Sequence, residues 1–523
     1  MHVYLETYGC TLNQADSDIM MGVLRHSGFR IAKRVSDADV IVLNTCTVKG
    51  RTENKIISRI EALRKQGKRI VVAGCLSINE KRVRKVCPEA VLVHPGAVAR
   101  IADAVRRAAE GKGGEFREKA AKEGLPRIFT KPILRIPIQE GCVGNCYFCQ
   151  TKLARPYLMS YSPKWIRSWV EEGVKKGAKE IQLTGMDSGA YGLDLGTDLV
   201  ALLDEVRRVK GDFRIRLGMI NPGHVNQTSR ATGGQKERRF GSEKKMLPGL
   251  LRVFGDGKFY KFFHLPVQTG SEKVRKEMNR AHSVADFRKV VQAIRKRFPD
   301  ACISTDIIVG YPTETGKDFG KTMELIREVK PDIVNVSKFA SRRGTKAAEM
   351  KEIPTGEVKR RSTELSELVR RIGAEKNKAY EGRRVEVLIT EKGKGNGKPG
   401  TQTVNQTSRA TEGQDKPNAR SRSGQRERAF GLEERRFGSV KPGTNRGTGG
   451  RLHGLTGNWK GRAKNYKQVC VFGKAKPGER AMVRITGSNH GSLFGKITGN
   501  RKQDGGNRQV SARHRRSDAE TGN

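Results

Sequence analysis

The first 110 residues alternate apolar strands with amphipathic helices, and each strand ends in a cysteine. The strands are expected in the segments "HVYLETYG", "DVIVLNT" and "KRIVVAG", and the helices between them in "ADSDIMMGVLRHSG" and "NKIISRIEALRKQG". Continuous apolar strands separated by amphipathic helices are typical of a parallel sheet covered on both faces. The pattern therefore predicts a doubly wound α/β domain over residues 1–110.

Cys10, Cys46 and Cys75 follow these three strands directly. The carboxyl ends of the strands of a doubly wound sheet share one edge, where ligands bind, so we expect the three thiols to converge there. The alternative is three unrelated buried cysteines, because cysteine is often buried. Thiolates are soft ligands, which favours a shared metal site. The other scattered cysteines are predicted to be packing residues: Cys87, Cys302 and Cys470.

A second cysteine group, CxxxCxxC, occupies the stretch "GCVGNCYFC" with Cys142, Cys146 and Cys149. Structural zinc is almost always four-coordinate, and no histidine or fourth cysteine lies near this loop. A [4Fe–4S] cluster is also normally held by four cysteines. Three ligands would leave one iron open to an external ligand, such as the amino and carboxylate groups of S-adenosylmethionine.

Two further domains are expected after a polar Gly-, Lys- and Glu-rich linker at 111–130. Residues 131–380 contain six strand–helix units, which predict a partial (β/α)6 barrel with its active site at the carboxyl-end mouth. Residues 382–497 contain short strands with glycine turns, which predict a small antiparallel β-barrel. The strands of the partial barrel are expected in "ILRIPIQEG", "EIQLTGMD", "FRIRLGMI", "FFHLPVQ", "CISTDIIVG" and "DIVNVSKF".

Two low-complexity stretches with shared words interrupt these domains, at about 225–244 and about 399–458. "VNQTSRATGGQ" in the first stretch nearly repeats as "VNQTSRATEGQ" in the second. Segments of this composition bury too little apolar surface to fold. Either they are inserted repeats without a function, which the duplication favours, or they form a basic arm that grips RNA. The tail at 498–523 is predicted to be disordered and basic.

The formal charge of +48 indicates a polyanionic partner, most plausibly nucleic acid. The sequence has no run of about 18 apolar residues, so we expect no transmembrane helix. The start, "MHVYLETYGC", lacks the pattern of a signal peptide. We therefore expect a cytoplasmic protein whose nine cysteines form no disulfide framework.

The CxxxCxxC loop after the first strand of a partial barrel resembles the radical S-adenosylmethionine (radical SAM) superfamily. The surrounding motifs are similar to those of the methylthiotransferase family, which has an N-terminal cluster domain, a radical SAM barrel and a C-terminal RNA-binding TRAM barrel. Two segments, "TLNQADSDIM" and "LTGMDSGAYGLDLGTDL", look most like the archaeal and eukaryotic branch. That branch modifies threonylcarbamoyladenosine beside the tRNA anticodon. The other motifs are "NTCTVKG", "AGC", "GCVGNCYFCQTKLAR", "HLPVQTGSEKV", "STDIIVGYPTET" and "SKFASRRGTKAA".

The resemblance implies two [4Fe–4S] clusters, one on Cys142, Cys146 and Cys149 and a second, auxiliary one on the three strand-end cysteines. S-adenosylmethionine would be both the methyl donor and the source of a 5′-deoxyadenosyl radical. The implied partners are the tRNA anticodon stem-loop, an electron donor and a sulfur source, and we expect a monomer. Contacts to S-adenosylmethionine are expected from Phe148, Gly185, Gln268 and Asp306. Contacts to RNA are expected from Arg462, Lys464, Tyr466 and Lys467.

Three residues depart from the family pattern: Pro156 replaces a usual glycine, Met186 a usual glutamine and Arg343 a common proline. The first two lie near the expected cofactor region, so altered activity is one possibility. Two alternatives therefore stay open beside a tRNA methylthiotransferase. One is a methylthiotransferase that acts on a ribosomal protein, and the other is a catalytically impaired iron–sulfur protein that binds RNA.

Overall fold

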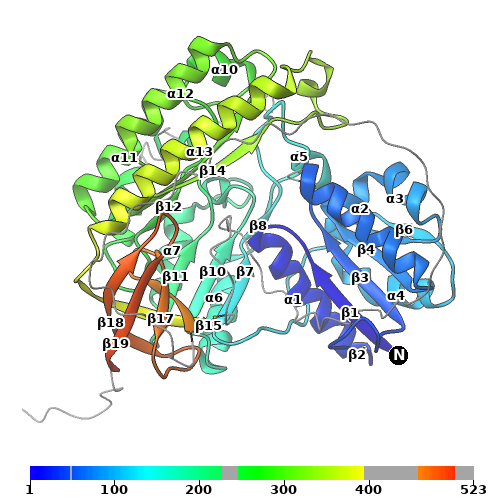
Figure 1. The fold of residues 1–523 in the computed structure, drawn as a ribbon. Helices are drawn as coiled ribbons and strands as arrows, with labels where there is room; N and C mark the ends of the chain where they lie inside the picture. Colours follow the sequence, from blue (N-terminus) through cyan, green and yellow to red (C-terminus); the bar gives the residue numbers. More distant parts are fainter. Residues whose placement is uncertain (48–49, 227–245, 394–457, 501–523) are drawn as a thin grey trace, which may run out of the picture.

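The computed structural model describes residues 1–47, 50–226, 246–393 and 458–500. Figure 1 shows the N-terminal parallel sheet on the right, the half barrel in the middle and at the upper left, and the small closed barrel at the lower left. The predicted insertions and the predicted tail fall almost entirely outside the described residues. Within the described parts of the chain, no helix has the length and apolarity needed to span a membrane.

The N-terminal sheet has six parallel strands in the order β2-β1-β3-β4-β5-β6. Alternate strand residues face opposite helix layers. Val40 and Val42 pack with α1 (Thr11–His26) and α4 (Ile101–Ala109), whereas Ile41 and Leu43 pack with α2 (Gly50–Lys65). The doubly wound prediction is therefore confirmed. The strands are β1 His2–Thr7, β2 Arg30–Ile31, β3 Val40–Thr45, β4 Arg69–Gly74, β5 Val91–Val93 and β6 Gly114–Phe116.

Strand β6 lies inside the stretch that the sequence predicts to be a linker. Gly114–Phe116 pairs with Val91–Val93 at the edge of the sheet. An edge strand is buried on few sides, so its residues need not be apolar, and its glycine and glutamate resemble linker composition. The start of the predicted linker is therefore wrong.

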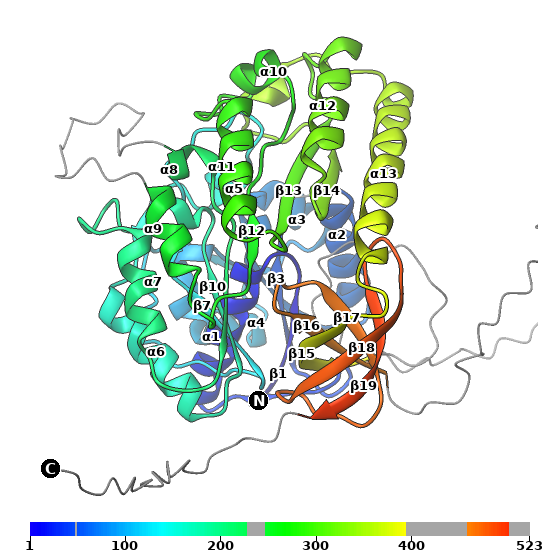
Figure 2. The same cartoon turned by 90° about the vertical axis from the view of Figure 1, so that its left-hand side faces the viewer.

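All six predicted strands of the half barrel are present, arranged as two parallel three-stranded sheets of order β11-β10-β7 and β12-β13-β14. A bridge between Ile215 and Phe259 links the two halves, and one apolar core runs through both. Figure 2 shows the outer helices ranged along one side of these strands. The strands are β7 Ile133–Pro137, β10 Glu180–Thr184, β11 Arg214–Leu217, β12 Phe262–His264, β13 Cys302–Val309 and β14 Ile333–Lys338. The helices are α6 Pro163–Lys175, α7 Leu199–Arg207, α9 Met246–Val253, α11 Val284–Arg297, α12 Gly316–Val329 and α13 Thr355–Lys378.

The C-terminal strands close into a barrel of order β15-β16-β17-β19-β18. All neighbours are antiparallel except β17 and β19, which pair in parallel. Strand β16 is not among the predicted strands, because its sequence "NWKGRA" lacks a run of apolar residues. The strands are β15 Arg384–Lys392, β16 Asn458–Ala463, β17 Gln468–Phe472, β18 Arg480–Ser488 and β19 Leu493–Asn500.

The turn between β16 and β17 docks the small barrel onto the half barrel. Lys467 Nζ lies 2.9 Å from Asp332 Oδ1, just before β14, and the Lys467 side chain is 9% exposed. Tyr466 packs on Tyr260 and Phe262, with ring centroids 4.9 and 5.0 Å away. Two of the residues predicted to contact RNA, Tyr466 and Lys467, are thus used in this contact between the barrels, and Tyr466 remains partly exposed.

Arg462 and Lys464 differ from these two neighbours. The Arg462 guanidinium stacks over the Tyr466 ring, at 4.7 Å from its centroid, and remains partly exposed. The Lys464 side chain is exposed. Both stay candidates for RNA contacts.

Replacing Asp332 with alanine is expected to loosen the docking of the small barrel. The Asp332 carboxylate accepts from Lys467 and also from Lys376 Nζ, at 2.8 Å, and is 3% exposed. Removing this carboxylate leaves a buried ammonium group without a counter-ion, which lowers the stability of the contact by about 3 kcal/mol. Amide hydrogen exchange in β17 is expected to be about 100-fold faster. Lys464→Ala, an exposed lysine in the same turn, is the control and should leave exchange unchanged.

The same contact has a defined dependence on pH. Burial opposes ionisation of Asp332, but Lys467 and Lys376 hold its pKa below the ordinary value. The stabilisation is then complete above about pH 4, the unfolded pKa, and is lost as pH falls through the lower folded pKa. Limited proteolysis at pH 7 and pH 3 should show this loss in the wild type and little pH dependence in Asp332→Ala. Equal protection of the two proteins at pH 7 would contradict the prediction.

Candidate active site between the N-terminal sheet and the half barrel

The loop with the CxxxCxxC motif follows β8 (Gln139–Glu140) and ends at α5 (Thr151–Ala154). Gly144 N donates to Cys142 Sγ at 3.2 Å, and Tyr147 N donates to Met278 O at 3.1 Å, which ties the loop to the second half of the barrel. Gly141 begins the loop with φ +66°, and a Cβ there would lie 1.8 Å from Tyr157 O. Only glycine fits this position.

Asp187 and Arg280 lie beside the loop thiols, and His224 lies beside Asp187. Asp187 Oδ2 lies 4.0 Å from Cys142 Sγ, and His224 Nε2 lies 3.3 Å from the same oxygen. Asp187 Oδ1 accepts from the backbone N–H groups of Gly189 and Asn221. On the other side, Arg280 Nη1 lies 3.6 Å from Cys146 Sγ.

Sequence reasoning missed Asp187, His224 and Arg280 as site residues. Asp187 had a local signal, since it follows the strand-end glycine motif "LTG". The other two come from distant segments, and only the fold brings them to the loop.

The electrostatics of this loop suit metal-bound thiolates. Burial raises the pKa of Cys142 to about 12, with a further contribution from Asp187, and burial also raises the pKa of Cys149. Burial opposes ionisation of Asp187 too, yet His224 and backbone N–H groups lower its pKa. Buried thiols next to a carboxylate ionise readily only when a cation compensates them, and a metal centre supplies that charge. The three donors therefore fit an iron–sulfur cluster.

The four residues predicted to contact S-adenosylmethionine lie around the barrel mouth. A Cβ at Gly185 would lie 2.8 Å from Gln139 Cγ, so this strand end has no room for a side chain. Gln268 has φ +72° and donates its N–H to Asp306 O at 2.9 Å. Phe148 packs in a small apolar cluster with Tyr311.

Asp306 joins the three strands of the second half barrel. Its Oδ2 lies 3.1 Å from His264 Nε2 on β12, and its Oδ1 accepts from Asn335 Nδ2 on β14 at 2.7 Å. The Asp306 side chain is 26% exposed, so this polar group is open to solvent or to a ligand.

The strand-end cysteines lie at one edge of the N-terminal sheet, after the neighbouring strands β1, β3 and β4. Cys46 and Cys75 are buried and Cys10 is exposed. Gly9 approaches Cys46 so closely that a Cβ would lie 3.0 Å from Cys46 Sγ, and its φ is +106°. The sheet thus brings the three residues to one place, as the parallel topology predicts.

Asn13 connects the loops that carry these cysteines. Its Nδ2 donates to Tyr8 O at 3.0 Å and to Thr45 O at 2.7 Å, and its Oδ1 lies 3.9 Å from Cys75 Sγ. Burial raises the pKa of Cys75, and the nearby Arg155 opposes that rise. Three soft donors of this kind suit a thiolate-bound cluster.

Neither cysteine group converges on a single metal ion. Among the residues that the structure describes, no three His, Cys, Asp or Glu side chains form a one-ion site. A four-iron cluster takes each thiolate on a different iron, so its ligands stay apart. None of the nine cysteines, all within the described ranges, forms a disulfide.

The elements next to the two cysteine groups pack against each other at the boundary of the two α/β units. Helix α5, directly after Cys149, packs against the short 3-10 helix Cys75–Ile78, and in Figure 1 it lies between the half barrel and the N-terminal sheet. Gln150 Nε2 lies 3.4 Å from Asn79 Oδ1. A cavity of about 570 Å³ opens at this junction, lined by Glu53, Ile78, Asn79, Glu80, Lys81, Arg82, Gln150, Ser341, Arg342 and Arg343.

The departures from the family pattern sit at the border of this site. Pro156 is exposed, next to the buried Arg155. Met186 is partly exposed between Gly185 and Asp187. Arg343 is exposed on the wall of the cavity.

Two family profiles match this chain, and each covers one of the α/β units. Residues 2–94 match the family described as "Uncharacterized protein family UPF0004". Residues 136–326 match the "Radical SAM superfamily", which implies S-adenosylmethionine and a [4Fe–4S] cluster.

Three curated relatives match over both units. A protein of Archaeoglobus fulgidus, "Probable threonylcarbamoyladenosine tRNA methylthiotransferase", is 42% identical over 75% of this chain and 89% of its own length. One of the same name from Methanothermobacter thermautotrophicus is 40% identical over 76% and 91%. The human "Threonylcarbamoyladenosine tRNA methylthiotransferase" is 32% identical over 74% and 66%. The chain therefore belongs to the threonylcarbamoyladenosine tRNA methylthiotransferases, a family of radical SAM enzymes.

Proposed function

We propose that this enzyme adds a methylthio group to carbon 2 of N6-threonylcarbamoyladenosine next to the tRNA anticodon. S-adenosylmethionine would serve as methyl donor and radical source. The observation that carries the proposal is the packing of α5, which follows one cysteine group, against the 3-10 helix Cys75–Ile78, which begins with a cysteine of the other. The names of the relatives and the charge of +48 support a tRNA substrate.

Cys142, Cys146 and Cys149 would hold the radical SAM cluster, and Cys10, Cys46 and Cys75 the second, auxiliary one. When bound, such clusters supply the one-electron and sulfur chemistry that an unactivated C–H bond requires. This chemistry also needs an electron donor and a sulfur source. We take the enzyme to work as a monomer in the cytoplasm.

The protein's own groups would orient the ligands and control their charge. Asp187, fixed by His224 and two backbone N–H groups, would accept a hydrogen bond from an ammonium group placed beside the loop. Gly185 lets the Gln139 side chain pack against this strand end, where Gln139 Nε2 donates to Asp187 O. Asp306, His264 and Asn335 would bind polar groups of the cofactor or the substrate.

The test is the nucleoside content of tRNA from a strain that lacks the gene. Mass spectrometry should show the loss of 2-methylthio-threonylcarbamoyladenosine, and a plasmid copy of the gene should restore it. An unchanged pool of this nucleoside would overturn the proposal. Loss of a methylthio group from a ribosomal protein instead would favour the ribosomal-protein alternative. If reconstituted protein with S-adenosylmethionine and dithionite makes no 5′-deoxyadenosine, the impaired RNA-binding protein is favoured.

A further inference from the structure

Four charged side chains meet in the interior between the N-terminal sheet and the half barrel. Lys122 Nζ lies 2.5 Å from Asp16 Oδ1 and 2.6 Å from Glu140 Oε1. Arg155 Nη2 lies 2.5 Å from Asp16 Oδ2, and Arg155 Nη1 pairs with Glu140 Oε2. No side chain of this quartet is more than 9% exposed. Lys122 lies in the stretch predicted to be a linker, which is therefore partly buried.

The quartet is attached to both cysteine groups. Asp16 is on α1, which begins directly after Cys10, and Glu140 lies just before the CxxxCxxC loop. Arg155 directly follows α5, on the barrel side, and extends to the N-terminal side. There its Nη2 lies 3.2 Å from Asn13 Oδ1, the same oxygen that lies 3.9 Å from Cys75 Sγ.

The quartet is electrically balanced, with two cations and two carboxylates. Burial opposes the charge on Asp16, but Lys122 and Arg155 lower its pKa. Burial likewise opposes the charge on Arg155, but Glu140 and Asp16 raise its pKa. Asp16 and Arg155 are thus held charged. Burying four charges is costly, so such a group is weak evidence for a role in stability alone.

We propose that Arg155 is a positioning residue for the auxiliary cluster. Its side chain reaches from the half barrel and places a fixed positive charge beside Cys75. This inference rests on the proposed function, because it requires a cluster on Cys10, Cys46 and Cys75. Reduction adds negative charge to a cluster, and hydrogen bonds and nearby charge set its potential. Arg155 therefore raises the reduction potential of this cluster, and Asp16 and Glu140 hold the guanidinium in place.

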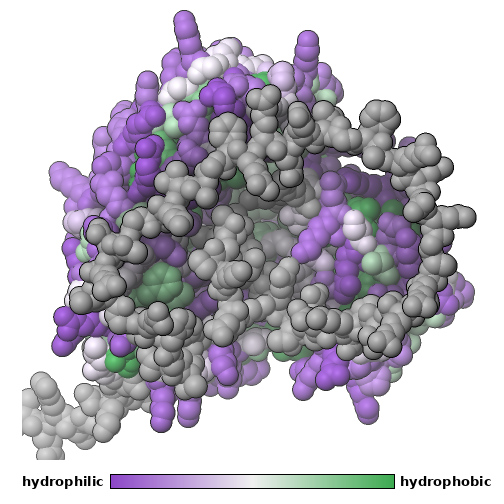
Figure 3. Space-filling view, viewed as in Figure 1, coloured by the Kyte–Doolittle hydropathy of each residue, from purple (hydrophilic) through white to green (hydrophobic). Residues whose placement is uncertain are grey.

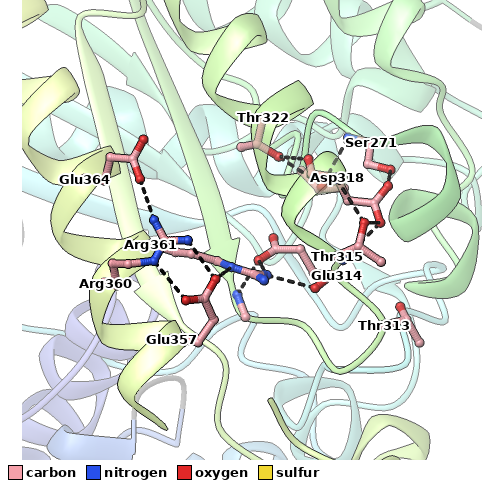
Figure 4. A network of polar contacts seen from close by, with 12 residues as sticks. Ser271, Thr313, Glu314, Thr315, Asp318, Thr322, Glu357, Arg360, Arg361 and Glu364 are labelled. Atoms are coloured by element: carbon pink, nitrogen blue, oxygen red, sulfur yellow. Dashed lines mark hydrogen bonds and ion pairs between the residues drawn. The ribbon is translucent and has the colours of Figure 1, made fainter. Parts of the chain in front are cut away.

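The chain contains a matched control for a buried arginine between two carboxylates. The Arg361 side chain is 6% exposed, and its Nη1 and Nε lie 2.8 Å from Glu314 Oε1 and 2.7 Å from Glu357 Oε1. Figure 4 shows Arg361 on α13 between these two carboxylates. The charge pattern is similar, but the position is the outer helix layer, so Arg361→Met should not affect the auxiliary cluster.

The experiment uses the full chain with Cys142, Cys146 and Cys149 all replaced by alanine, so that only the auxiliary cluster assembles. After anaerobic reconstitution with iron and sulfide, a redox titration followed by electron paramagnetic resonance gives its midpoint potential. Arg155→Met should shift the potential to a more negative value. Arg155→Lys keeps the charge without the planar fork, and its potential should lie between those of the parent and of Arg155→Met. Arg361→Met should match the parent.

A double variant provides a second test in case Arg155→Met does not fold. Glu140→Gln with Arg155→Met removes one charge of each sign and leaves the Asp16–Lys122 pair intact. It should also give a more negative potential, because Arg155, and not Glu140, lies beside Cys75. If both Arg155→Met variants match Arg361→Met, the inference is wrong and the proposed function stands. If the parent binds no iron, the auxiliary cluster of the proposed function is wrong, and this inference with it.

Discussion

Replacing Cys146 with alanine is expected to lower the formation of 5′-deoxyadenosine from S-adenosylmethionine by about 10³-fold or more, because the loss of an essential group leaves little residual rate. Three thiols already leave a cubane cluster one ligand short, and two would not hold it. The change also leaves Arg280, whose Nη1 lies 3.6 Å from the thiol, beside an apolar methyl group. Product formation with dithionite as reductant, measured by liquid chromatography, checks this expectation.

The control is Cys302→Ala, in the same half barrel. Cys302 is fully buried at the start of β13, away from the carboxyl-end mouth where the CxxxCxxC loop lies. Its replacement removes one sulfur atom from the core and should leave 5′-deoxyadenosine formation within about twofold, since it changes only packing. Iron content separates the two variants: Cys146→Ala should retain about four irons and Cys302→Ala about eight. Wild-type activity in Cys146→Ala would contradict the assignment of this loop.

Local sequence patterns predict most of this fold because each strand carries its own signal. Strand, turn and cysteine are adjacent in the chain at Cys10, Cys46 and Cys75, so parallel topology alone brings them to one edge. The strands that the pattern misses are short or lie where apolar residues are not required. Strand β6 is at a sheet edge, and β16 contributes little more than Trp459 and Ala463 to the apolar core of its barrel.

The polar environment of the site is not predicted in the same way, because its members are distant in the chain. His224, Arg280 and Lys122 give no local sign that they approach a cysteine or a carboxylate. A run of basic and aromatic residues in the β16–β17 turn suggests an RNA surface. In the fold, however, Lys467 neutralises Asp332 between two barrels. Composition alone does not distinguish an exposed lysine from one whose partner lies more than a hundred residues away.

The quartet would also keep the two proposed cofactor sites, which lie on separate sheets, at a constant separation. Glu140 precedes one cysteine loop and Arg155 follows it, while Asp16 lies on the helix that starts at the other site. Each carboxylate is shared by both cations, so neither sheet can move without breaking a buried ion pair. The proposed reaction requires such a fixed arrangement, since both sites must reach the same adenine.

Replacing Cys46 with alanine is expected to stop formation of the methylthio nucleoside while cleavage of S-adenosylmethionine continues. Cys46 is 5% exposed and directly follows β3, the middle one of the three strands that end in the proposed auxiliary ligands. Its loss should remove the auxiliary cluster and lower formation of the methylthio nucleoside by about 10³-fold or more. Cleavage of S-adenosylmethionine should persist within about twofold, because the Cys142–Cys149 loop keeps its own ligands. Iron content should fall from about eight to about four per chain.

The matched control for Cys46 is Cys87→Ala, which replaces a cysteine of the same N-terminal sheet unit. Cys87 is 1% exposed and packs with Ala90 and Leu92 in the apolar core, away from the cysteine edge. It should keep all the iron and both products. Two measurements on the same sample decide the outcome: 5′-deoxyadenosine, and the methylthio nucleoside in a tRNA substrate. If Cys46→Ala still makes the methylthio nucleoside at the wild-type rate, sulfur insertion does not depend on this site. A loss of both products with eight irons retained would instead indicate that Cys46 supports the fold between the sheets and holds no cluster.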